Sequence, residues 1–571
     1  MNAELAEIFY EIANILELKK VQWKPAAYRK AAKAIEGLGK DVREIYEEGE
    51  VKALKEIPGV GDAIAQKIIE FIETGKIKHY EELKKTLPEG VEQMMKIPGV
   101  GAKKSMFLYK KLGINSIKEL ENAAKEHKLA GLKTFKEKSE ENILKGIALL
   151  KVSKGRTLLG FALPIAREIE NKLKSLKEVK EAITAGSLRR REETIGDIDI
   201  IVVATEYEKV VDFFVKLPFV KRVLAKGDTK AAILTKDNMQ VDIRIIEPKS
   251  FGSALQYFTG NKEHNIQLRK IAIKKRLKLN EYGLFSGKNQ IAGKTEEEVY
   301  NKLGMPYIEP ELRTERGEIE AALKNQLPDI IGYKDVLGDL HTHTTQSDGN
   351  NSIEEMAEAA KALGMKYIAI TDHGGVTGLI HHLDEKKLEK QIKEIDKLNG
   401  KLNGITILKG SEVDVKADGK LALGDSILKK LDVVIAAVHS GFKFPKDRMT
   451  KRILKAMDNP YVNVIGHPTG RLLQKRQPYE VELDKIFDKA KETEIALEIN
   501  ASPDRLDLND ACVKEGISRG IKFSIGTDSH ATGQLKQIEF GISVARRGWA
   551  EKKDIINTLN LDELKRFLNR N

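Results

Sequence analysis

The chain contains a single cysteine, Cys512, among its 571 residues. One thiol cannot form a disulfide within the chain, so a disulfide-stapled fold is excluded and a reducing compartment is favoured. The apolar runs, such as 433–438, are much shorter than the roughly 20 residues that a membrane-spanning helix needs. The opening MNAELAEIFYEIANILELKK has no basic segment followed by a long apolar stretch, so no signal peptide is expected. These absences predict a cytoplasmic protein without a membrane segment.

Positive charge is concentrated in the first part of the chain. The net charge is +12, and residues 1–335 carry 61 basic and 51 acidic side chains, a net charge of +10. Residues 336–571 carry 37 basic and 35 acidic side chains, a net charge of +2. A polyanionic partner is therefore expected to bind the first part. Charge alone would favour the simpler interpretation, a lysine-rich solvated surface, so the motifs must decide.

The hydrophobic pattern changes along the chain, and 571 residues exceed what a single core supports. Helical spacing dominates residues 1–150, which contain the phrase IPGVG twice, and β-rich runs such as IDIIVVA appear between 151 and 255. From residue 339, seven short apolar runs alternate with helical segments. The runs are DLHTH (339–343), YIAITDH (367–373), ITILKGSEV (405–413), VVIAAVHS (433–440), VNVIGHP (462–468), IALEIN (495–500) and FSIGTDSH (523–530). This alternation predicts a parallel α/β barrel or sheet.

Potential metal ligands stand at or near the ends of these runs. In a parallel barrel the C-terminal ends of the strands meet at one rim, where reactive groups collect. His341 and His343 alternate along one strand, so both imidazoles face the same side, and Asp528 and His530 repeat that spacing. The nine candidate ligands are His341, His343, Asp348, His373, Glu412, His439, His467, Asp528 and His530.

A lone histidine at a strand end is more often structural than a ligand, but six of the chain's 11 histidines fall among these nine positions. Imidazole and carboxylate ligands suit Zn²⁺, Mn²⁺ or Fe²⁺, and nine ligands are too many for one ion, so two or three metals are expected. Clustered metals generate hydroxide at neutral pH and stabilise a phosphoryl displacement. His381 and His382 stand outside the strand ends and are interpreted as structural, although His381 could line a substrate groove.

The phrases HTHTTQSDG, TDHGG, GSEVD, AAVHS, IGHP and GTDSH resemble the motif set of the PHP (polymerase and histidinol phosphatase) family. The resemblance covers about residues 336–571. It implies a distorted seven-stranded barrel with a trinuclear metal centre and phosphoesterase activity. All nine ligand positions of the family are filled, which argues against a degenerate, purely structural copy.

A second acidic cluster lies in AGSLRRREETIGDIDIIVV (185–203). Gly186 and Ser187 are expected to open a turn whose backbone N–H groups bind phosphate oxygens. Asp197 and Asp199 alternate on a strand and face the same way, and Asp242 can join them from a neighbouring strand. Adjacent carboxylates repel unless a cation lies between them, and three of them facing a triphosphate suit Mg²⁺. The DID triplet alone would indicate only a solvated strand end; the whole pattern is more specific.

This pattern resembles the nucleotidyltransferase superfamily, and YFTGNKEHNIQLRKIA (257–272) resembles the thumb motif of the family X DNA polymerases, the group of DNA polymerase beta. The resemblance covers residues 1 to about 320. It implies that Asp197, Asp199 and Asp242 bind catalytic Mg²⁺ or Mn²⁺. Further implied contacts are Gly186, Ser187 and Arg190 with the triphosphate, Tyr257, Phe258 and Gly260 with the sugar, Asn265 with the minor-groove edge of the incoming base, and Arg269 with the template strand. Lys262 stands where the vertebrate enzyme has an acidic residue.

The two IPGVG phrases are typical of helix-hairpin-helix motifs, in which glycines let the backbone approach a phosphate without reading sequence. Their glycines are Gly59 and Gly61, and Gly99 and Gly101. A single GVG could be any tight turn, but two copies in a basic chain favour DNA binding. The resemblance implies that the first hairpin binds the downstream strand of a gap and the second the primer side.

Lys67 matches the lysine that forms a Schiff base with a 5′-deoxyribose phosphate in the resembling enzyme. Lys24 and Tyr28 match residues around that pocket, and His79 stands at the position of an auxiliary lysine. A lyase lysine needs a pKa lowered by nearby positive charge or by burial. A solvated lysine that only contacts phosphate is an equally good interpretation, so both stay open.

The sequence is therefore identified as a member of the PHP-containing family X DNA polymerases, with a multidomain α+β polymerase core followed by an α/β barrel. The expected domains are a helical DNA-binding domain (1–80), a fingers-like helical domain (81–150), a nucleotidyltransferase palm (151–255), a thumb (256–316), a linker (317–338) and the PHP barrel (339–571). The expected function is to fill short gaps in gapped or nicked DNA from dNTPs during base excision repair. The barrel is expected to be a metal-dependent 3′–5′ exonuclease, or a 3′-phosphatase or abasic-site endonuclease.

Two alternatives stay open, and no obligatory protein partner is expected. One is an untemplated nucleotidyltransferase with a phosphatase domain, which would extend single strands without a preference for gaps. The other makes the barrel a non-catalytic scaffold that orients the polymerase on DNA.

Overall fold

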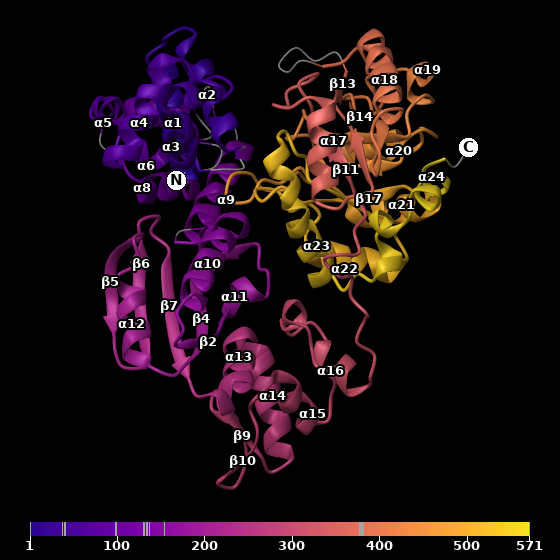
Figure 1. Ribbon diagram of the computed structural model, residues 1–571. Coiled ribbons are helices and arrows are strands. Elements are labelled where there is room, and N and C mark those ends of the chain that lie inside the picture. Colours follow the sequence, from indigo (N-terminus) through magenta and orange to yellow (C-terminus); the bar gives the residue numbers. More distant parts are fainter. Residues whose placement is uncertain are drawn as a thin grey trace.

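The computed structural model describes residues 2–569 other than 37, 39–40, 89, 98–99, 130–131, 133–134, 136, 154 and 376–381. The first half of the chain runs from an N-terminal group of helices through a sheet to a small mixed lobe, and the barrel of the second half lies back beside the N-terminal helices (Figure 1). In this described part of the chain, no helix combines the length and the apolar character needed to cross a membrane.

Two groups of helices make up the N-terminal part, and each has its own hydrophobic core. The first group comprises α1 (Asn2–Leu18), α2 (Lys24–Glu36), α3 (Val42–Lys55), α4 (Asp62–Thr74) and α5 (Lys78–Lys84). Phe9, Ile12 and Ile68 are fully buried in its core. The second group comprises α6 (Val91–Met95), α7 (Ala102–Leu112), α8 (Ile117–Lys125) and α9 (Glu137–Ser153), and it packs around Leu108 and Leu120. The expected helix-hairpin-helix pairs are α3 with α4 and α6 with α7.

A five-stranded sheet follows, with strand order β2-β4-β7-β6-β5. Its elements are β1 (Thr157–Leu158), α10 (Leu159–Lys174), β2 (Val179–Thr184), α11 (Gly186–Arg189), β3 (Thr194–Ile195), β4 (Asp197–Ala204), α12 (Tyr207–Val215), β5 (Val220–Lys226), β6 (Lys230–Thr235) and β7 (Gln240–Ile246). β4 and β7 are parallel neighbours, and their register sets Asp199 directly opposite Asp242. This pairing brings together two acidic residues that are far apart in the sequence.

The mixed lobe after the sheet contains a three-stranded antiparallel sheet covered by helices. Its elements are η1 (Pro248–Ser250), α13 (Phe251–Thr259), α14 (Lys262–Lys274), β8 (Lys278–Asn280), β9 (Gly283–Ser286), β10 (Asn289–Ala292), α15 (Glu296–Leu303), η2 (Pro310–Leu312) and α16 (Glu318–Leu323). Arg313 is fully buried here, and its guanidinium forms an ion pair with Glu296 and lies over the rings of Tyr300 and Tyr307.

The second half is a parallel barrel whose strands alternate with helices. Its strands are β11 (Gly338–Thr342), β12 (Tyr367–Ile370), β13 (His373–Gly374), β14 (Thr406–Asp414), β15 (Val433–Ala437), β16 (Val464–Ile465), β17 (Ala496–Asn500) and β18 (Phe523–Gly526). Its helices are α17 (Ile353–Ala362), α18 (Glu385–Asn399), α19 (Asp425–Leu428), α20 (Lys446–Met457), α21 (Leu483–Thr493), α22 (Asp510–Arg519), η3 (Thr532–Gln537), α23 (Ile538–Arg547), η4 (Lys552–Asp554), η5 (Ile556–Thr558) and α24 (Leu561–Leu568).

Seven of these strands follow one another in the order β11-β12-β14-β15-β16-β17-β18, and the short β13 pairs with β14 beside that path. A parallel bridge between Thr342 and Ser529 brings the first strand back to the segment after the last, so the barrel is nearly closed. The strand interiors are buried on both faces, as parallel sheets covered by helices require. The predicted seven-stranded α/β barrel after a helical and α+β first half is confirmed.

Candidate active sites

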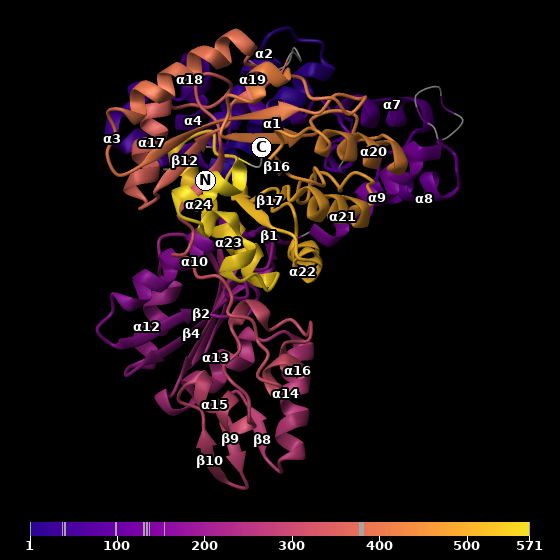
Figure 2. The ribbon, with the colours of Figure 1, turned by 90° about the vertical axis from the view of Figure 1, so that its right-hand side faces the viewer.

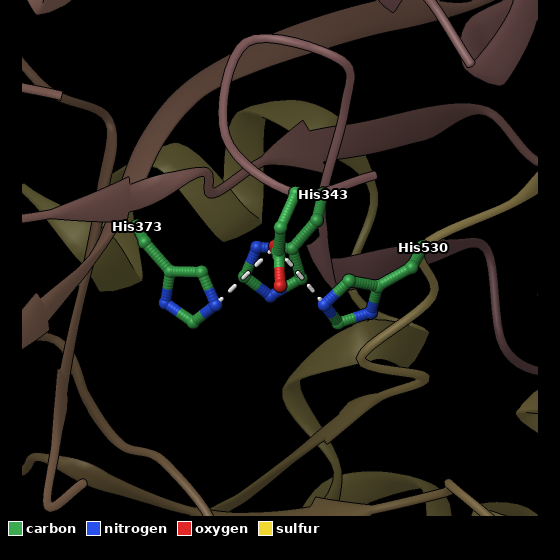
Figure 3. Close-up of side chains that lie close together, drawn as sticks. His343, His373 and His530 are labelled. Atoms are coloured by element: carbon green, nitrogen blue, oxygen red, sulfur yellow. Dashed lines mark ion pairs between the residues drawn. The ribbon is translucent and has the colours of Figure 1, made fainter. Parts of the chain in front are cut away.

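The candidate ligands of the barrel meet at the C-terminal ends of its strands. Their ligand atoms form three groups within which all atoms lie within 4.8 Å of one another. The groups are His343, Asp348, His373 and His530; His341, His343 and Asp528; and His373, Glu412 and His439. Figure 3 shows the imidazoles of His343, His373 and His530 turned toward one another. The rings of His343 and His530 are stacked, with their centroids 4.4 Å apart.

Glu412, near the end of β14, belongs to one of these groups and also contacts a further histidine. Its carboxylate lies 2.9 Å from His373 Nδ1, 3.0 Å from His439 Nε2 and 2.9 Å from His467 Nε2. His467 thereby joins the cluster although it belongs to none of the three groups. The structure therefore brings together all nine side chains that the sequence predicts as ligands.

Buried atoms without hydrogen bonds test whether this cluster fits metal ions. Among the described residues, His341 Nε2, His343 Nε2, Asp348 Oδ1 and Glu412 Oε2 are buried and make no hydrogen bond of good geometry, although each lies 2.9–3.5 Å from an imidazole or carboxylate atom of another ligand. Buried polar atoms without a well-formed hydrogen bond are rare because each one costs desolvation free energy without full compensation. Imidazole nitrogens and carboxylate oxygens aimed at a shared space are the ligand set of Zn²⁺, Mn²⁺ or Fe²⁺, so these residues fit a centre of several ions.

The electrostatics of the cluster agree with this fit. Burial disfavours the charged form of His439, but the carboxylates of Glu412 and Asp414 outweigh burial and raise the pKa of His439 to about 10. Burial and the neighbouring rings of His530 and His373 lower the pKa of His343 instead. In the absence of a cation the cluster therefore holds protons on some imidazoles to balance its carboxylates, and a bound cation can take over that role.

A shell of buried acidic side chains orients the predicted ligands. Glu498 Oε1 lies 2.6 Å from His341 Nδ1, and Asp414 Oδ1 lies 2.6 Å from His439 Nδ1. Each contact leaves Nε2 of the imidazole free to face the cluster, the arrangement that commonly orients metal-binding histidines. Asp372 accepts hydrogen bonds from the backbone and hydroxyl of Thr344 (2.7 and 2.6 Å), which fixes the loop that carries Asp348.

The orienting roles of Asp414, Asp372 and Glu498 are not among the predictions from the sequence. Arg505 was also missed: its Nε lies 3.3 Å from Asp528 Oδ2. For the acidic residues, a position at or near a strand end was the only feature of the sequence that could have indicated such a role. Arg505 does not have even that feature. His382, interpreted as structural, lies 3.5 Å from Asp414 at the margin of the cluster. His381 lies outside the described residues.

The palm carboxylates form the second site. Asp197 and Asp199 lie on β4, and Asp242 lies on β7 directly opposite Asp199. Burial, followed by the charges of Asp197 and Asp242, raises the pKa of Asp199 to about 6. In the part of the chain that the structure describes, these three carboxylates do not gather all their ligand atoms within 4.8 Å as the barrel groups do. Their mutual repulsion is nevertheless the signature of a site that a divalent cation would neutralise.

The predicted triphosphate turn lies beside these carboxylates. Gly186 adopts a φ of +64°, and a Cβ at this position would lie 2.8 Å from Asp199 Oδ2, so only glycine fits without displacement. Ser187, next along α11, accepts a hydrogen bond at its carbonyl from the Glu192 N–H (3.0 Å). Arg190 is largely buried and donates to the Thr259 carbonyl (2.7 Å). The turn therefore connects the sheet to the YFTG segment.

The predicted sugar and base contacts lie on α13 and α14. The rings of Tyr257 and Phe258 pack edge to face, 5.1 Å apart. Asn265 is buried, and its amide donates to the carbonyls of Tyr257 (2.7 Å) and Gly260 (3.0 Å) while it accepts from Gln256 (2.8 Å). A contact of Asn265 with an incoming base would require these bonds to open. Arg269, one helical turn later, is exposed.

The two hairpins present helix N-termini to the solvent. Gly59 has a φ of +85°, where a Cβ would lie 2.9 Å from Lys30 Cγ, so the first hairpin requires a residue without a side chain. Gly61 precedes α4 and Gly101 precedes α7, and in both places a Cβ would meet no atom within 4 Å. Free backbone N–H groups at such open helix starts can bind phosphate. Gly99 lies outside the described residues.

The surroundings of Lys67 bear on its two interpretations. Its Nζ donates to the Ala63 carbonyl (2.9 Å) on α4. Burial lowers the pKa of Lys67, and the positive charge of Lys24 lowers it further, although Glu70 acts in the opposite direction. Burial and then Lys67 also lower the pKa of His79. Tyr28 is buried against Phe9 with ring centroids 5.6 Å apart.

Family models match the chain in the same order as these structural parts. A helix-hairpin-helix domain matches residues 1–77, a SAM-like helix-hairpin-helix tandem 91–148, the DNA polymerase beta palm 163–273, the DNA polymerase beta thumb 254–314, and the PHP domain 339–502. Together the fold, the two sites and these matches define a family X DNA polymerase that carries a PHP domain. Such domains imply divalent metal ions and a DNA substrate.

Whole-chain comparison extends this assignment. The DNA polymerase/3′-5′ exonuclease PolX of Bacillus subtilis (strain 168) is 37% identical over 573 residues, which cover 100% of this chain and 99% of that protein. A probable phosphatase of Thermoanaerobacter sp. (strain X514) is 33% identical over 40% of this chain and 93% of its own length. A probable phosphatase of Acetivibrio thermocellus is 29% identical over 35% of this chain. The chain belongs to the PolX family of family X DNA polymerases with a PHP domain.

Proposed function

We propose that this chain fills short gaps in duplex DNA from dNTPs, as in base excision repair, and that its barrel trims 3′ ends. The observation that carries the polymerase role is the register of Asp199 against Asp242 beside the glycine turn at Gly186. Asp197, Asp199 and Asp242 would hold Mg²⁺ or Mn²⁺, and Gly186, Ser187 and Arg190 would hold the triphosphate. When bound, such ions activate the primer hydroxyl and stabilise the departing pyrophosphate.

The thumb and the hairpins would position the substrates. Tyr257, Phe258 and Gly260 would flank the sugar, Asn265 would meet the base after its amide rearranges, and Arg269 would contact the template. Lys24, Tyr28 and the hairpin glycines Gly59, Gly61, Gly99 and Gly101 would contact the DNA backbone. Two open helix starts can bind the DNA backbone at two places, as the two sides of a gap require, which supports gap filling against untemplated extension.

The barrel would be a metal-dependent 3′–5′ exonuclease with two or three Mn²⁺, Zn²⁺ or Fe²⁺ ions held by the nine predicted ligands. When bound, these ions supply a hydroxide nucleophile and stabilise the displaced oxygen. Glu498 and Asp414 fix the imidazoles of His341 and His439, and Arg505 offers a guanidinium beside Asp528 to an entering phosphate. The buried ligand atoms that make no hydrogen bond of good geometry support a working centre against a purely structural barrel. A 3′-phosphatase or an abasic-site endonuclease would use the same chemistry.

A substrate comparison tests the polymerase proposal. The wild type and Asp242→Asn would be given dNTPs with a primer beside a one-nucleotide gap carrying a downstream 5′-phosphate, and with the same primer as a single strand. We expect templated addition on the gap, little addition on the single strand, and loss of both in the variant. Equal, untemplated extension of the single strand would favour the alternative nucleotidyltransferase.

A 5′-deoxyribose phosphate lyase is a second candidate function, because burial and Lys24 lower the pKa of Lys67 as an amine nucleophile requires. Borohydride would trap a Schiff base between Lys67 and an incised abasic site. We expect trapping by the wild type and by a variant of an exposed lysine, Lys76→Ala, but not by Lys67→Ala. Equal trapping by Lys67→Ala would show that Lys67 does not form the Schiff base, and its role would then be to contact phosphate.

We further propose a cytoplasmic location, no obligatory protein partner, and the domain boundaries 1–80, 81–150, 151–255, 256–316, 317–338 and 339–571. The separate hydrophobic cores of the helical groups support a division of the N-terminal part into two units, with Leu83 of α5 still in the first core. Gel filtration of the pure chain with gapped DNA, in the absence of other proteins, tests whether it acts alone.

A further inference from the structure

We propose that Arg547 of the barrel is a positioning residue for the polymerase site, where it holds the turn that carries Arg190. The proposal rests on the proposed role of Arg190 in binding the triphosphate. Arg547 ends α23, which belongs to the part of the barrel that lies against the palm (Figure 2). It lies 357 residues from the turn in sequence.

The guanidinium of Arg547 is buried between the two domains. Its Nη1 donates to the backbone carbonyl of Arg190 (2.9 Å). Its Nη2 lies 3.0 Å from Glu192 Oε2 on the palm side and 2.7 Å from Asp510 Oδ2 on the barrel side. Only 4% of the side chain is exposed, so water screens these contacts poorly. Arg547 thus ties a palm loop to α22 of the barrel.

The same loop carries the contacts that orient Arg190. Glu192 lies between the two arginines, with Oε1 3.4 Å from Arg190 Nε and Oε2 bound by Arg547. The Glu192 N–H donates to the Ser187 carbonyl (3.0 Å), so a shift of Glu192 would also displace the backbone of the triphosphate turn. Arg191, between them, has a φ of +55°, a backbone conformation that is disfavoured for residues with a Cβ. Contacts from outside the loop, such as those of Arg547, add to the hydrogen bonds within the turn that hold this conformation.

Arg471, a second arginine of the barrel, binds the palm at Glu193, the residue after Glu192. Arg471 binds both oxygens of Glu193, at 3.2 Å and 2.5 Å. Gln474 donates to the carbonyl of Arg156 (2.9 Å), and Arg156 in turn donates to Thr194 Oγ1 (2.8 Å). The barrel therefore contacts the palm at Arg190, Glu192 and Glu193, shortly before the strand that bears Asp197, and it reaches Thr194 through Arg156.

This attachment makes the barrel a structural component of the nucleotide site. Without Arg547, Glu192 loses its buried partner and the Arg190 carbonyl loses its donor, so Arg190 is no longer fixed toward the triphosphate. Affinity for the incoming dNTP should fall, while the palm carboxylates that act on the bound nucleotide keep their places on β4 and β7. The expected signature is a raised KM for dNTP with a smaller change in kcat.

The test compares single-nucleotide gap filling by the wild type, Arg547→Ala and Arg547→Lys. Exonuclease activity and melting temperature are measured on the same preparations. We expect KM for dNTP to rise on the order of tenfold in Arg547→Ala and to recover in part in Arg547→Lys. Exonuclease activity should persist. Glu539→Gln is the matched control, because it removes the bidentate Arg167–Glu539 pair between the same two domains without touching the loop.

If Arg547→Ala does not fold, a second variant that fills the space of the guanidinium keeps the proposal testable. Arg547→Met removes the guanidinium while Asp510 keeps Arg316 as its partner at 2.9 Å, and it should show the same rise in KM. An unchanged KM in folded, nuclease-active variants would overturn the role of Arg547 and leave gap filling intact. A rise of equal size in Glu539→Gln would also overturn it, because the effect would then belong to the interface as a whole. Absence of gap filling by the wild type would contradict the proposed function and this role together.

Discussion

Glu498 Oε1 lies 2.6 Å from His341 Nδ1, and the other oxygen of this carboxylate accepts the His467 N–H at 2.6 Å. One buried side chain thus orients two predicted ligands that come from β11 and from the loop after β16. Both oxygens of Glu498 are occupied by these two histidines, so its role is to orient them.

Substitution of Glu498 should weaken metal binding without unfolding the barrel. Glu498→Gln keeps the shape but removes the negative charge that favours an Nδ1-protonated His341, and loss of such a partner typically lowers metal affinity 10- to 100-fold. Direct Mn²⁺ binding and exonuclease activity should fall together, while gap filling persists. Unchanged Mn²⁺ affinity would contradict the orienting role, and the exposed Glu494→Gln serves as the control.

The palm site should respond to pH through Asp199. Its pKa is raised to about 6 by burial and by the charges of Asp197 and Asp242, so it takes up a proton as the pH falls through about 6. Protonation removes a metal ligand, so the Mg²⁺ concentration that half-saturates gap filling should rise steeply below that pH. Because the folded pKa exceeds the unfolded value, ionisation above pH 6 destabilises the metal-free fold, and Mg²⁺ should raise the melting temperature more at pH 7.5 than at pH 5. A shift in melting temperature that is independent of pH would contradict this account.

A buried ion network joins the palm turn to the thumb. Glu296 binds Arg189 of α11 at 2.6 and 2.9 Å and also pairs with the buried Arg313. Burial alone would raise the pKa of Glu296, but Arg313 and Arg189 outweigh it and lower this pKa to about 2. Glu296→Gln leaves two arginines without a counterion, so it should reduce the free energy of unfolding by about 3–5 kcal/mol. Chemical denaturation of the wild type and the variant measures this loss.

The pH dependence of that network has a definite sign. Because the folded pKa of Glu296 lies below its unfolded value, its stabilisation is complete above the unfolded pKa and disappears as the pH falls toward 2. The difference in stability between wild type and Glu296→Gln should therefore shrink under acid. A difference that stays constant from pH 7 to pH 3 would show that the ionised carboxylate is not the stabilising group.

The N-terminal DNA-binding helices reach the metal cluster directly. Lys33 of α2 places its Nζ 2.7 Å from Asp348 Oδ2, with its side chain about half exposed. A positive charge beside a predicted ligand opposes cation binding, so Lys33→Ala should tighten Mn²⁺ binding roughly two- to fivefold, the size expected of an exposed pair. Lys30→Ala, on the same helix and exposed, should have no effect. Weaker Mn²⁺ binding by Lys33→Ala would contradict the competition.

Much of both sites could be predicted from the sequence because strand geometry is regular. Residues i and i+2 of a strand lie on the same face, so the phrases HTH and DID each predict a pair of neighbouring ligands. Parallel strands bring their C-terminal ends to one rim of a barrel, so the ligands of different strands are predicted to meet there. The identity of an orienting residue could not be predicted, because Glu498 and Glu412 are both strand-end carboxylates. Only the interatomic distances show that Glu498 orients a histidine, whereas Glu412 faces the cluster.

Contacts across domains also lay beyond the sequence. Nothing near Arg547 indicates that it binds the Arg190 carbonyl, since no periodicity links segments 357 residues apart. The engagement of the Asn265 amide with Tyr257 and Gly260 was equally hidden, because a motif gives the residue but not the rotamer.

The central claim is that one chain carries two separate active sites. A 5′-labelled primer at a one-nucleotide gap would be incubated in Mn²⁺ with the wild type, Asp242→Ala and His341→Ala, with and without dNTPs. We predict extension lost only in Asp242→Ala and shortening lost only in His341→Ala. Shortening that survives in pure His341→Ala, or that disappears in Asp242→Ala, would contradict the claim.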